Sequence, residues 1–299
     1  MNTFQQHCGL RGKHPSLHRS NLRQAARNKA PIERFTTGRI CLRSHPSAFR
    51  RVPALLEAFT LIELLVVIAV IAILASLLLP VLSSAKERSH RTACVSNIRQ
   101  FILATHLYAN DFQDCLPSGG TDNRDPKDTH TPILSSNTKT NILQYARPLK
   151  VLDCPNLALS FEQDQSWRVQ PDYGVAIGYH YLGGQLNTPW APAGNVTNTW
   201  ISPQKTVDDP TLPLVADLNV YAYSYQRILA PHTSRGPLIR DEAYFELHPE
   251  AYQQTPVAIG AQGGNVGLLS GSVEWKSIAR MKSYRSSQLW GADGSFGLW

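Results

Sequence analysis

The part of this chain after residue 58 lacks the short motifs that usually mark a metal centre or a catalytic centre. It contains neither a CxxC nor an HxxxH spacing, so the sequence predicts no metal site. Its histidines and paired acids are scattered, as at His180, His232, His248, Asp208-Asp209 and Asp241-Glu242. The paired acids are expected on solvated turns. No set for acid–base or nucleophilic catalysis is recognisable, and the chain is not expected to be an enzyme.

Methionine is scarce, since Met1 and Met281 are the only two. A later natural start before the first apolar run would therefore need another codon, as at Val52 or Leu55. Residues 1–58 hold 11 of the 29 Lys and Arg but two of the 22 acids, whereas the rest of the chain is slightly acidic. A basic, weakly apolar stretch of this kind is typical of a disordered leader. Without this leader, the chain is not expected to bind nucleic acid.

Charge is almost absent from Phe59 to Leu82, where Glu63 is the one ionisable side chain. These residues would form about 36 Å of helix, and the hydrocarbon core of a bilayer is about 30 Å thick. From Leu64 to Leu79 the only polar side chain is Ser76. A helix in the core of a soluble domain normally has a polar face, so the pattern favours a membrane-spanning helix.

Two other kinds of signal are possible for the same stretch. A secretory signal peptide has a shorter apolar region that ends in an Ala-x-Ala-like site, whereas this run is longer and ends without one. A twin-arginine signal is suggested by Arg50-Arg51, but Val52-Pro53 follows where non-breaking apolar residues are expected. Both alternatives fit less well than a segment that stays in the product.

The residues Ala58-Phe59-Thr-Leu-Ile-Glu63-Leu-Leu-Val-Val-Ile68 resemble the class III signal of type IV prepilins and type II secretion pseudopilins. The resemblance implies that a prepilin peptidase cuts between Ala58 and Phe59 on the cytoplasmic side and N-methylates Phe59. The apolar segment would remain in the product. This chain departs from the pattern in having Ala58 where Gly is usual, and in its long leader.

The resemblance also implies a role for Glu63 in assembly. In the family, the Glu at this position meets the N-terminal ammonium of a neighbouring subunit, so cleavage before Phe59 would create the cation that neutralises it. An ionised carboxylate at the centre of a membrane helix costs roughly 2.5–3.5 kcal/mol, which makes Glu63 a functional candidate. Phe59 and Glu63 share a helix face. The alternative is that Glu63 lies near the interface and extends into water.

Pro80 lies where pilins often carry a proline that kinks the helix. A face with spacings of three and four continues beyond it, at Ser84, Arg88, Arg91, Val95, Ile98, Ile102, Thr105 and Ala109. The pattern predicts one helix from Phe59 to about Asn110. Residues 59–82 would span the membrane, and residues 83–111 would form an amphipathic continuation that lies across a globular head.

Residues 112–299 are predicted to form that head, with a small antiparallel sheet packed on the helix. The fold class is therefore α+β. Short apolar segments between turn signals predict strands at Tyr179–Leu182, Leu214–Leu218, Asn265–Leu269 and Ser272–Lys276. Gly263-Gly264 and Ser270-Gly271 are expected to be turns, the second joining a hairpin.

A weaker resemblance extends into the head, to a group of pilin-like proteins with an enlarged head. Its landmarks are Cys94-Val-Ser-Asn-Ile-Arg-Gln100, Tyr108-Ala-Asn-Asp111, Leu116-Pro117, Leu152-Asp-Cys-Pro155, Tyr173-Gly174 and Leu214-Val-Ala-Asp217. That group commonly ends in a stretch resembling His-x-Gly-Gly-x-Asn-Val-Leu-Phe-x-Asp-Gly-Ser-Val. The stretch from Gly263 to Trp275 keeps the glycines and the Asn, but it lacks the His and has Ser270 where Asp is usual.

The cysteines and one acid complete the expectations for the head. Cys8 and Cys41 would leave with the leader, and the other three would face an oxidising exterior. The spacing leaves three pairings open. The resemblance pairs Cys94 with Cys154, and Cys115 is then left over. No cofactor is predicted, although pilin-like heads sometimes bind calcium through a C-terminal loop, which makes Asp293 the one candidate.

The expected function is that of a structural pilin-like subunit of a pilus or a type II secretion pseudopilus. The partners implied are prepilin peptidase, other pilin-like subunits and the inner-membrane assembly machinery. Lys and Arg are balanced around the apolar run, so the leader and the resemblance alone place the N-terminus in the cytoplasm and the head in the periplasm or outside. The alternative is a membrane-anchored surface module whose Trp- and Tyr-rich head binds a polysaccharide or a protein.

Overall fold

The computed structural model describes residues 60–123, 125, 129–146, 149–157, 169–170, 172–222, 226–250, 254–288 and 294–299. The chain divides into two compact units between Ala69 and Val70. The helices and strands are α1 (Leu61–Asp111), β1 (Ile133–Leu134), α2 (Ser136–Tyr145), η1 (Leu149–Leu152), β2 (Val169–Gln170), β3 (Gly174–Ala176), β4 (Tyr179–Tyr181), β5 (Pro213–Asp217), β6 (Val220–Ala222), β7 (Arg227–Thr233), β8 (Gly236–Arg240), α5 (Glu242–Leu247), β9 (Gly263–Leu268), β10 (Val273–Ser277), η3 (Ile278–Arg280), β11 (Ser283–Arg285) and β12 (Ser295–Leu298).

Helix α1 is continuous over 51 residues and contains Pro80 in its interior. The prediction of one helix to about Asn110 is confirmed, and an end of the helix at Pro80 is excluded. Pro80 has no N–H to donate, so one backbone hydrogen bond is missing at this turn. The bend that the proline is expected to cause stays a prediction.

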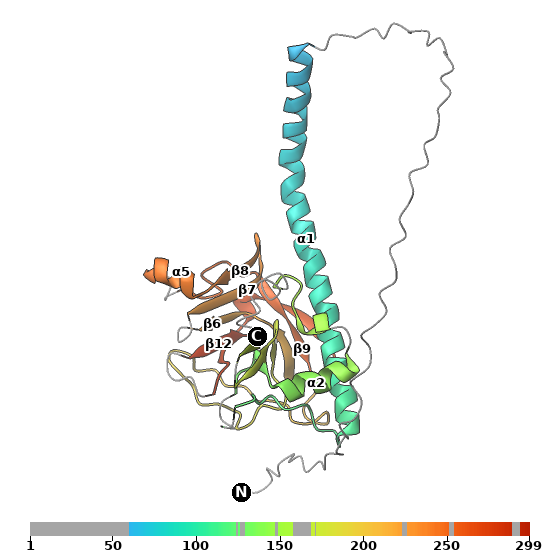
Figure 1. The fold of residues 1–299 in the computed structure, drawn as a ribbon, viewed down its shortest axis with the longest axis vertical. Coiled ribbons are helices and arrows are strands. Elements are labelled where there is room, and N and C mark those ends of the chain that lie inside the picture. Colours follow the sequence, from blue (N-terminus) through green and yellow to red (C-terminus); the bar gives the residue numbers. More distant parts are fainter. Residues whose placement is uncertain are drawn as a thin grey trace, which may run out of the picture. The chain divides into compact units, whose positions relative to one another are not determined.

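The strands of the head form three antiparallel sheets in the described part of the chain (Figure 1). The four strands predicted from the sequence correspond to β4, β5, β9 and β10, and they lie together in one sheet with the order β10-β9-β5-β4. A five-stranded sheet has the order β11-β12-β6-β7-β8, and a small sheet has the order β1-β3-β2. The combination of a long helix with antiparallel sheets confirms the α+β class.

The hairpin between β9 and β10 is confirmed at Ser270-Gly271. Leu268 N–H donates to the Ser272 carbonyl at 2.8 Å, and Gly271, with φ +86°, donates to the Leu268 carbonyl at 2.9 Å. The prediction of a second turn at Gly263-Gly264 is wrong, because both residues lie in β9. Gly263 is needed for a close approach of strands: a Cβ there would lie 2.1 Å from the Lys276 carbonyl oxygen of β10.

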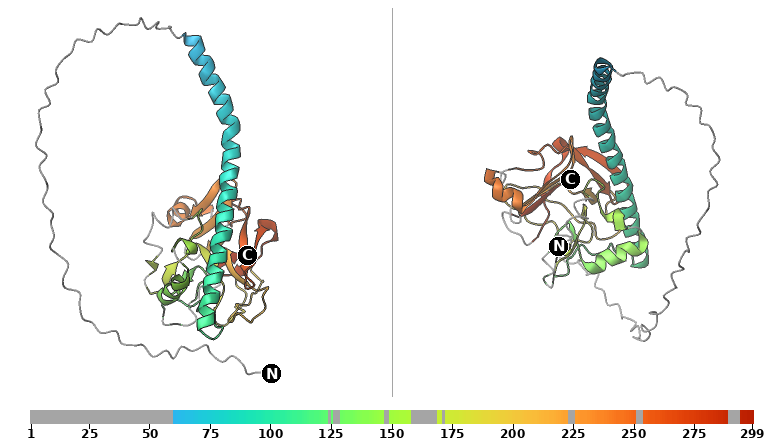
Figure 2. Two further views of the ribbon diagram at one scale, coloured as in Figure 1. Left: turned by 90° about the vertical axis from the view of Figure 1, so that its right-hand side faces the viewer. Right: turned by 45° about the horizontal axis from the view of Figure 1, so that its top comes forward.

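The C-terminal part of α1 packs on the four-stranded sheet. Figure 1 shows α1 passing beside β9, and in the left view of Figure 2 the helix crosses the head. Gly267 of β9 allows the close approach, since a Cβ there would lie 2.6 Å from side-chain atoms of Ile98 and of Ile102. Phe101 stacks on Tyr181 of β4 with ring centroids 5.5 Å apart. These contacts belong to the main hydrophobic core, which holds the helix on the sheet.

The buried face of α1 differs from the predicted one at its start. Ile98, Ile102, Thr105 and Ala109 are buried as expected, but Ser84 and Arg88 are exposed. The helix instead buries Glu87 and Cys94 at the N-terminal end of this face. The helical pattern of apolar residues cannot predict that Glu87 is buried, because a carboxylate is buried only where specific groups pair with it or donate hydrogen bonds to it.

Candidate functional site

The start of α1 is closed by a reciprocal capping box formed by Thr60 and Glu63. Thr60 N–H and Thr60 Oγ1 each lie 2.8 Å from Glu63 Oε2, and Glu63 N–H donates to Thr60 Oγ1 at 3.2 Å. This pattern satisfies backbone donors that have no partner within a helix. The sequence Thr-x-x-Glu was the signal for it. Glu63 therefore has a local role that the resemblance did not indicate.

The other two residues of the expected processing and assembly site are Ala58 and Phe59. Both lie outside the described residues, so cleavage between them and the contact of Phe59 with Glu63 stay predictions. Glu63 itself lies in the first turn of α1. A carboxylate is favoured there because the N-terminal end of a helix carries partial positive charge.

The apolar first part of α1 is exposed along its length. The side chains from Leu61 to Leu82 are exposed except for the half-buried Ala75, and the most apolar window has none of its residues buried. Leu61 is 86% exposed and Leu82 is 65% exposed. The core helix of a soluble domain would be covered, and the described chain does not cover this segment. The segment is long and apolar enough to cross a membrane as a single span.

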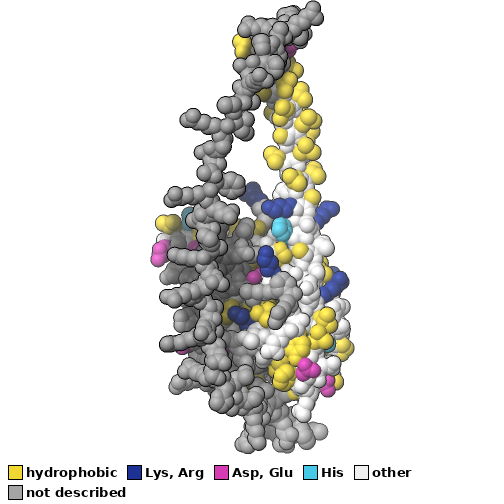
Figure 3. All heavy atoms as spheres, turned by 45° about the vertical axis from the view of Figure 1, so that its right-hand side comes forward, with side chains coloured by type: hydrophobic (Ala, Val, Ile, Leu, Met, Phe, Trp, Pro, Cys, Tyr) yellow, Lys and Arg dark blue, Asp and Glu magenta, His cyan; other side chains and the backbone are white. Residues whose placement is uncertain are grey.

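The exposed apolar part of α1 is followed by a group of basic residues. Figure 3 shows hydrophobic side chains along the exposed part of the helix and Lys or Arg beyond them. Lys86 and Arg88 are exposed, and the half-buried Arg91 lies with its guanidinium 4.0 Å from the Trp275 ring centroid. These basic side chains mark the end of the uncharged stretch that begins after Glu63.

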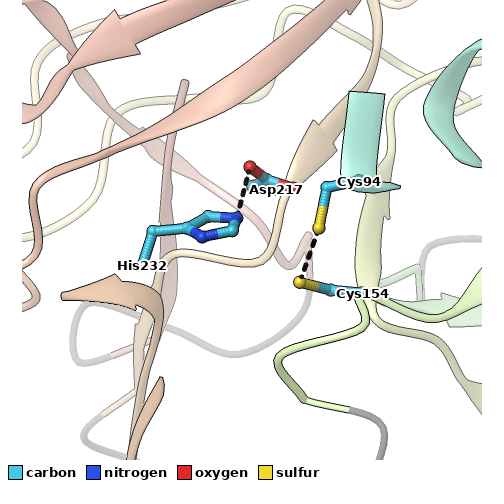
Figure 4. Close-up of side chains that lie close together, drawn as sticks. All are labelled: Cys94, Cys154, Asp217 and His232. Carbon is cyan, nitrogen blue, oxygen red and sulfur yellow. Dashed lines mark hydrogen bonds and ion pairs between the residues drawn. The ribbon is translucent and has the colours of Figure 1, made fainter. Parts of the chain in front are cut away.

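A second site lies in the head, where four metal-ligating side chains converge: Cys94 of α1, Cys154 after η1, Asp217 of β5 and His232 of β7 (Figure 4). All four are fully buried, and their ligand atoms lie within 4.8 Å of one another. The two Sγ atoms are 3.1 Å apart. His232 Nε2 lies 3.2 Å from Asp217 Oδ2, which is an ion-pair distance without hydrogen-bond geometry.

Further buried side chains surround this cluster and orient its members. Glu87 Oε1 lies 2.8 Å from His232 Nδ1, and Asn156 Nδ2 donates to Glu87 Oε2 at 2.9 Å. On the other side, Asn265 donates to Asp217 Oδ2 from its backbone N–H at 2.6 Å and from Nδ2 at 2.9 Å. The imidazole and the carboxylate are thus held in place by groups outside the cluster.

The protonation of the cluster follows from these contacts. Burial alone would lower the pKa of His232, but its contacts with Asp217, Cys154 and Glu87 raise that pKa to about 12. Burial alone would raise the pKa of Cys154, but its contacts with Cys94 and His232 lower it to about 7. The hydrogen bond to Cys154, together with burial, raises the pKa of Cys94. The contact between the two sulfurs therefore favours a thiolate at Cys154 that accepts from the Cys94 thiol.

The predictions for the cysteines have separate outcomes. Cys94 and Cys154 are brought together as the resemblance implies, but as thiols in contact, since a disulfide bond has a length of about 2.05 Å. A disulfide between them stays a prediction. Cys115 is disulfide-bonded in the full chain, whereas the prediction that it is left over concerns the chain without residues 1–58 and stays a prediction.

Residue spacing in the sequence could not reveal the cluster. Its first and last members, Cys94 and His232, are 138 positions apart, and the four residues share no short motif. The signal lay in the landmarks of the resemblance, since Cys94, Cys154, Asp217 and Asn265 all belong to it. His232 does not.

The other polar residues considered in the sequence make hydrogen bonds that stabilise the fold. His180 is buried between Thr131 Oγ1 at 2.7 Å and the Asn219 carbonyl at 3.2 Å, and burial lowers its pKa to about 4. Asp208 and Asp209 accept backbone N–H groups in turns, as predicted. Asp293, the calcium candidate, lies outside the described residues.

Comparison with known proteins gives one informative similarity. The chain is 42% identical over 55 residues to the type IV wide pilus major component PilA4 of Thermus thermophilus. The matched stretch is 18% of this chain and 42% of that protein, so the chain spans less than half the length of this relative. No protein-family model matches the chain, and no solved structure matches it. The similarity and the long apolar helix together are pilin-like.

Proposed function

We propose that this chain is a structural pilin-like subunit that prepilin peptidase processes between Ala58 and Phe59 and that then assembles into a pilus or a type II secretion pseudopilus. The observation that carries the proposal is the exposed apolar part of α1, which begins at the capped Glu63. The partial similarity to a pilus component supports it. The function is polymerisation, with no catalytic step and no nucleic acid partner.

Assembly in this proposal is driven by the packing of α1 segments from neighbouring subunits. Apart from Glu63, the side chains from Leu61 to Leu82 are apolar or small, and they are left uncovered by the described chain. In a membrane they contact lipid, and in a filament they contact other helices. Each subunit would therefore exchange lipid contacts for helix contacts as it leaves the membrane.

Glu63 would select the register of that packing. Both contacts of its carboxylate with Thr60 use Oε2. The N-methylated ammonium of Phe59 from a neighbouring subunit would approach the same carboxylate and neutralise it. A charge pair of this kind is favoured in apolar surroundings, where an unpaired carboxylate is costly.

In such a subunit the N-terminus lies in the cytoplasm, the span in the inner membrane and the head in the periplasm or outside. Its partners are prepilin peptidase, other pilin-like subunits and the assembly machinery of the inner membrane. No cofactor is required for assembly.

The rival function, a surface module that binds through exposed aromatic side chains, has less support. Three of the four described tryptophans are buried: Trp190, Trp200 and Trp299. They contact one another edge to face, with centroids 5.2 and 5.5 Å apart. The fourth, Trp275, lies against Arg91 and His232. Trp167 and Trp290 lie outside the described residues. The described tryptophans stabilise the head and do not line a binding face.

The test is to follow the chain in filaments sheared from cells, with an antibody against the head. We expect the protein in the sheared fraction when prepilin peptidase is present and only in the membrane when it is absent. A chain that never enters the sheared fraction, or enters it equally without the peptidase, would argue against an assembling subunit.

A further inference from the structure

We propose that Cys94, Cys154, Asp217 and His232 form a zinc site. Two sulfurs, one imidazole nitrogen and one carboxylate oxygen make a donor set that zinc commonly binds in proteins. The four ligand atoms already lie within 4.8 Å of one another, and they come from α1, the segment after η1, β5 and β7. This inference does not depend on whether the chain assembles into filaments.

The sulfur separation is closer to what zinc requires than to a disulfide bond. With Zn–S bonds of about 2.3 Å, a tetrahedral site has sulfurs about 3.7 Å apart. The Sγ atoms of Cys94 and Cys154 are 3.1 Å apart, so a zinc ion would need them to separate by about 0.6 Å. A disulfide bond of about 2.05 Å would need an approach of about 1 Å.

The imidazole of His232 is oriented as a zinc ligand. Its Nδ1 faces the Glu87 carboxylate at 2.8 Å, which leaves Nε2 directed at the cluster. A ligating histidine usually donates its other N–H to a carboxylate, which determines the tautomer and the ring orientation. Arg91 Nε lies 3.0 Å from Glu87 Oε1 and so orients this carboxylate in turn.

Two buried polar atoms of the cluster have no hydrogen-bond partner among the described residues: Asp217 Oδ1 and His232 Nε2. Buried polar atoms are seldom left in this state. A disulfide between the cysteines would still leave both atoms without a hydrogen-bond partner. A zinc ion would use Nε2 and a carboxylate oxygen, once Nε2 and both sulfurs have lost their protons.

The four ligands complete the coordination of zinc and are all buried, so the site would be structural and not catalytic. It would connect α1 with β5 of the four-stranded sheet and with β7 of the five-stranded sheet. Zinc would therefore stabilise the packing of the long helix on the head.

The test uses the full chain in detergent, reduced, stripped with a chelator and then titrated with Zn²⁺ and with Co²⁺ as a spectroscopic probe. We expect one zinc per chain and the thiolate charge-transfer and tetrahedral d–d bands of bound Co²⁺. X-ray absorption of the zinc-loaded protein should show two sulfur ligands and two nitrogen or oxygen ligands. These results need no substitution and so do not depend on the folding of a variant.

Substitutions then assign the ligands. The Cys94→Ser, Cys154→Ser double variant should lose the Co²⁺ charge-transfer bands, whereas Cys115→Ser, a cysteine outside the cluster, should keep them. A reduced and folded wild-type chain that takes up no zinc would overturn the proposal. So would a Cys94–Cys154 disulfide in protein isolated from its own membranes, and His232 would then act as a protonated bridge between Glu87 and Asp217.

Glu87→Gln tests the orienting role of the second carboxylate. The substituted amide would keep the size of the side chain but accept a weaker hydrogen bond from His232 Nδ1. We expect zinc affinity to fall about 10- to 100-fold while the number of sulfur ligands stays at two. Unchanged affinity would show that Glu87 does not act on a bound ion, which would contradict the arrangement proposed here.

Discussion

Glu63→Gln is expected to reduce assembly into filaments by about 100-fold while the chain still inserts in the membrane. With an amide in place of this carboxylate, the ammonium of Phe59 from a neighbouring subunit would be left unpaired in apolar surroundings. On insertion scales a charge at membrane depth costs roughly 2.5–3.5 kcal/mol, which corresponds to a factor of about 100 in an equilibrium constant. The measurement is the ratio of sheared to membrane-bound protein.

The choice of Gln separates the two roles of Glu63. A Gln can still accept from Thr60 in a capping box, so the start of α1 should persist. Thr60→Val is the matched control, because it removes the hydroxyl that contacts Glu63 but keeps the carboxylate. Its expected cost is about 1 kcal/mol of helix stability, with a much smaller loss of filaments. If Thr60→Val were as damaging as Glu63→Gln, the cap and not the charge would determine assembly.

Phe101→Ala is expected to destabilise the head strongly. Phe101 is fully buried and stacks on Tyr181, where the helix crosses the sheet. Loss of a buried Phe side chain typically costs about 3–5 kcal/mol, because both transfer free energy and packing are lost. For a head of this size the expected fall in Tm is about 10 °C. Thermal unfolding of the full chain, followed by near-ultraviolet circular dichroism, measures it.

Leu103→Ala is the matched control on the same helix. Leu103 is 58% exposed, so its truncation should change the unfolding free energy by less than about 0.5 kcal/mol. An equal loss of unfolding free energy in the two variants would mean that α1 does not pack on the head through the face that carries Phe101.

Much of the fold could be predicted because its signals are local. The apolar run and the continued spacing of three and four predicted α1, and short apolar segments between turn signals predicted the strands of the four-stranded sheet. The turn predicted at Gly263-Gly264 is wrong because a pair of glycines is found both in tight turns and in strands that another backbone approaches closely. Only the cross-strand contact with Lys276 distinguishes the two.

The polar cluster in the head could not be predicted from spacing. Cys94, Cys154, Asp217 and His232 meet only after the helix has packed on the sheet and β5 and β7 have entered their sheets. The burial of Glu87 depends on the same packing, because its partners Asn156 and His232 are distant in sequence. The capping box at Thr60 and Glu63, in contrast, was readable from four successive residues.

That prepilin peptidase processes this chain is tested by the intact mass and N-terminal sequence of the protein from its native membranes, with and without the peptidase. We expect a chain that begins at N-methylated Phe59 only when the peptidase is present. A chain that keeps residues 1–58 in the presence of the peptidase, or one that is cut after Leu82, would contradict this claim.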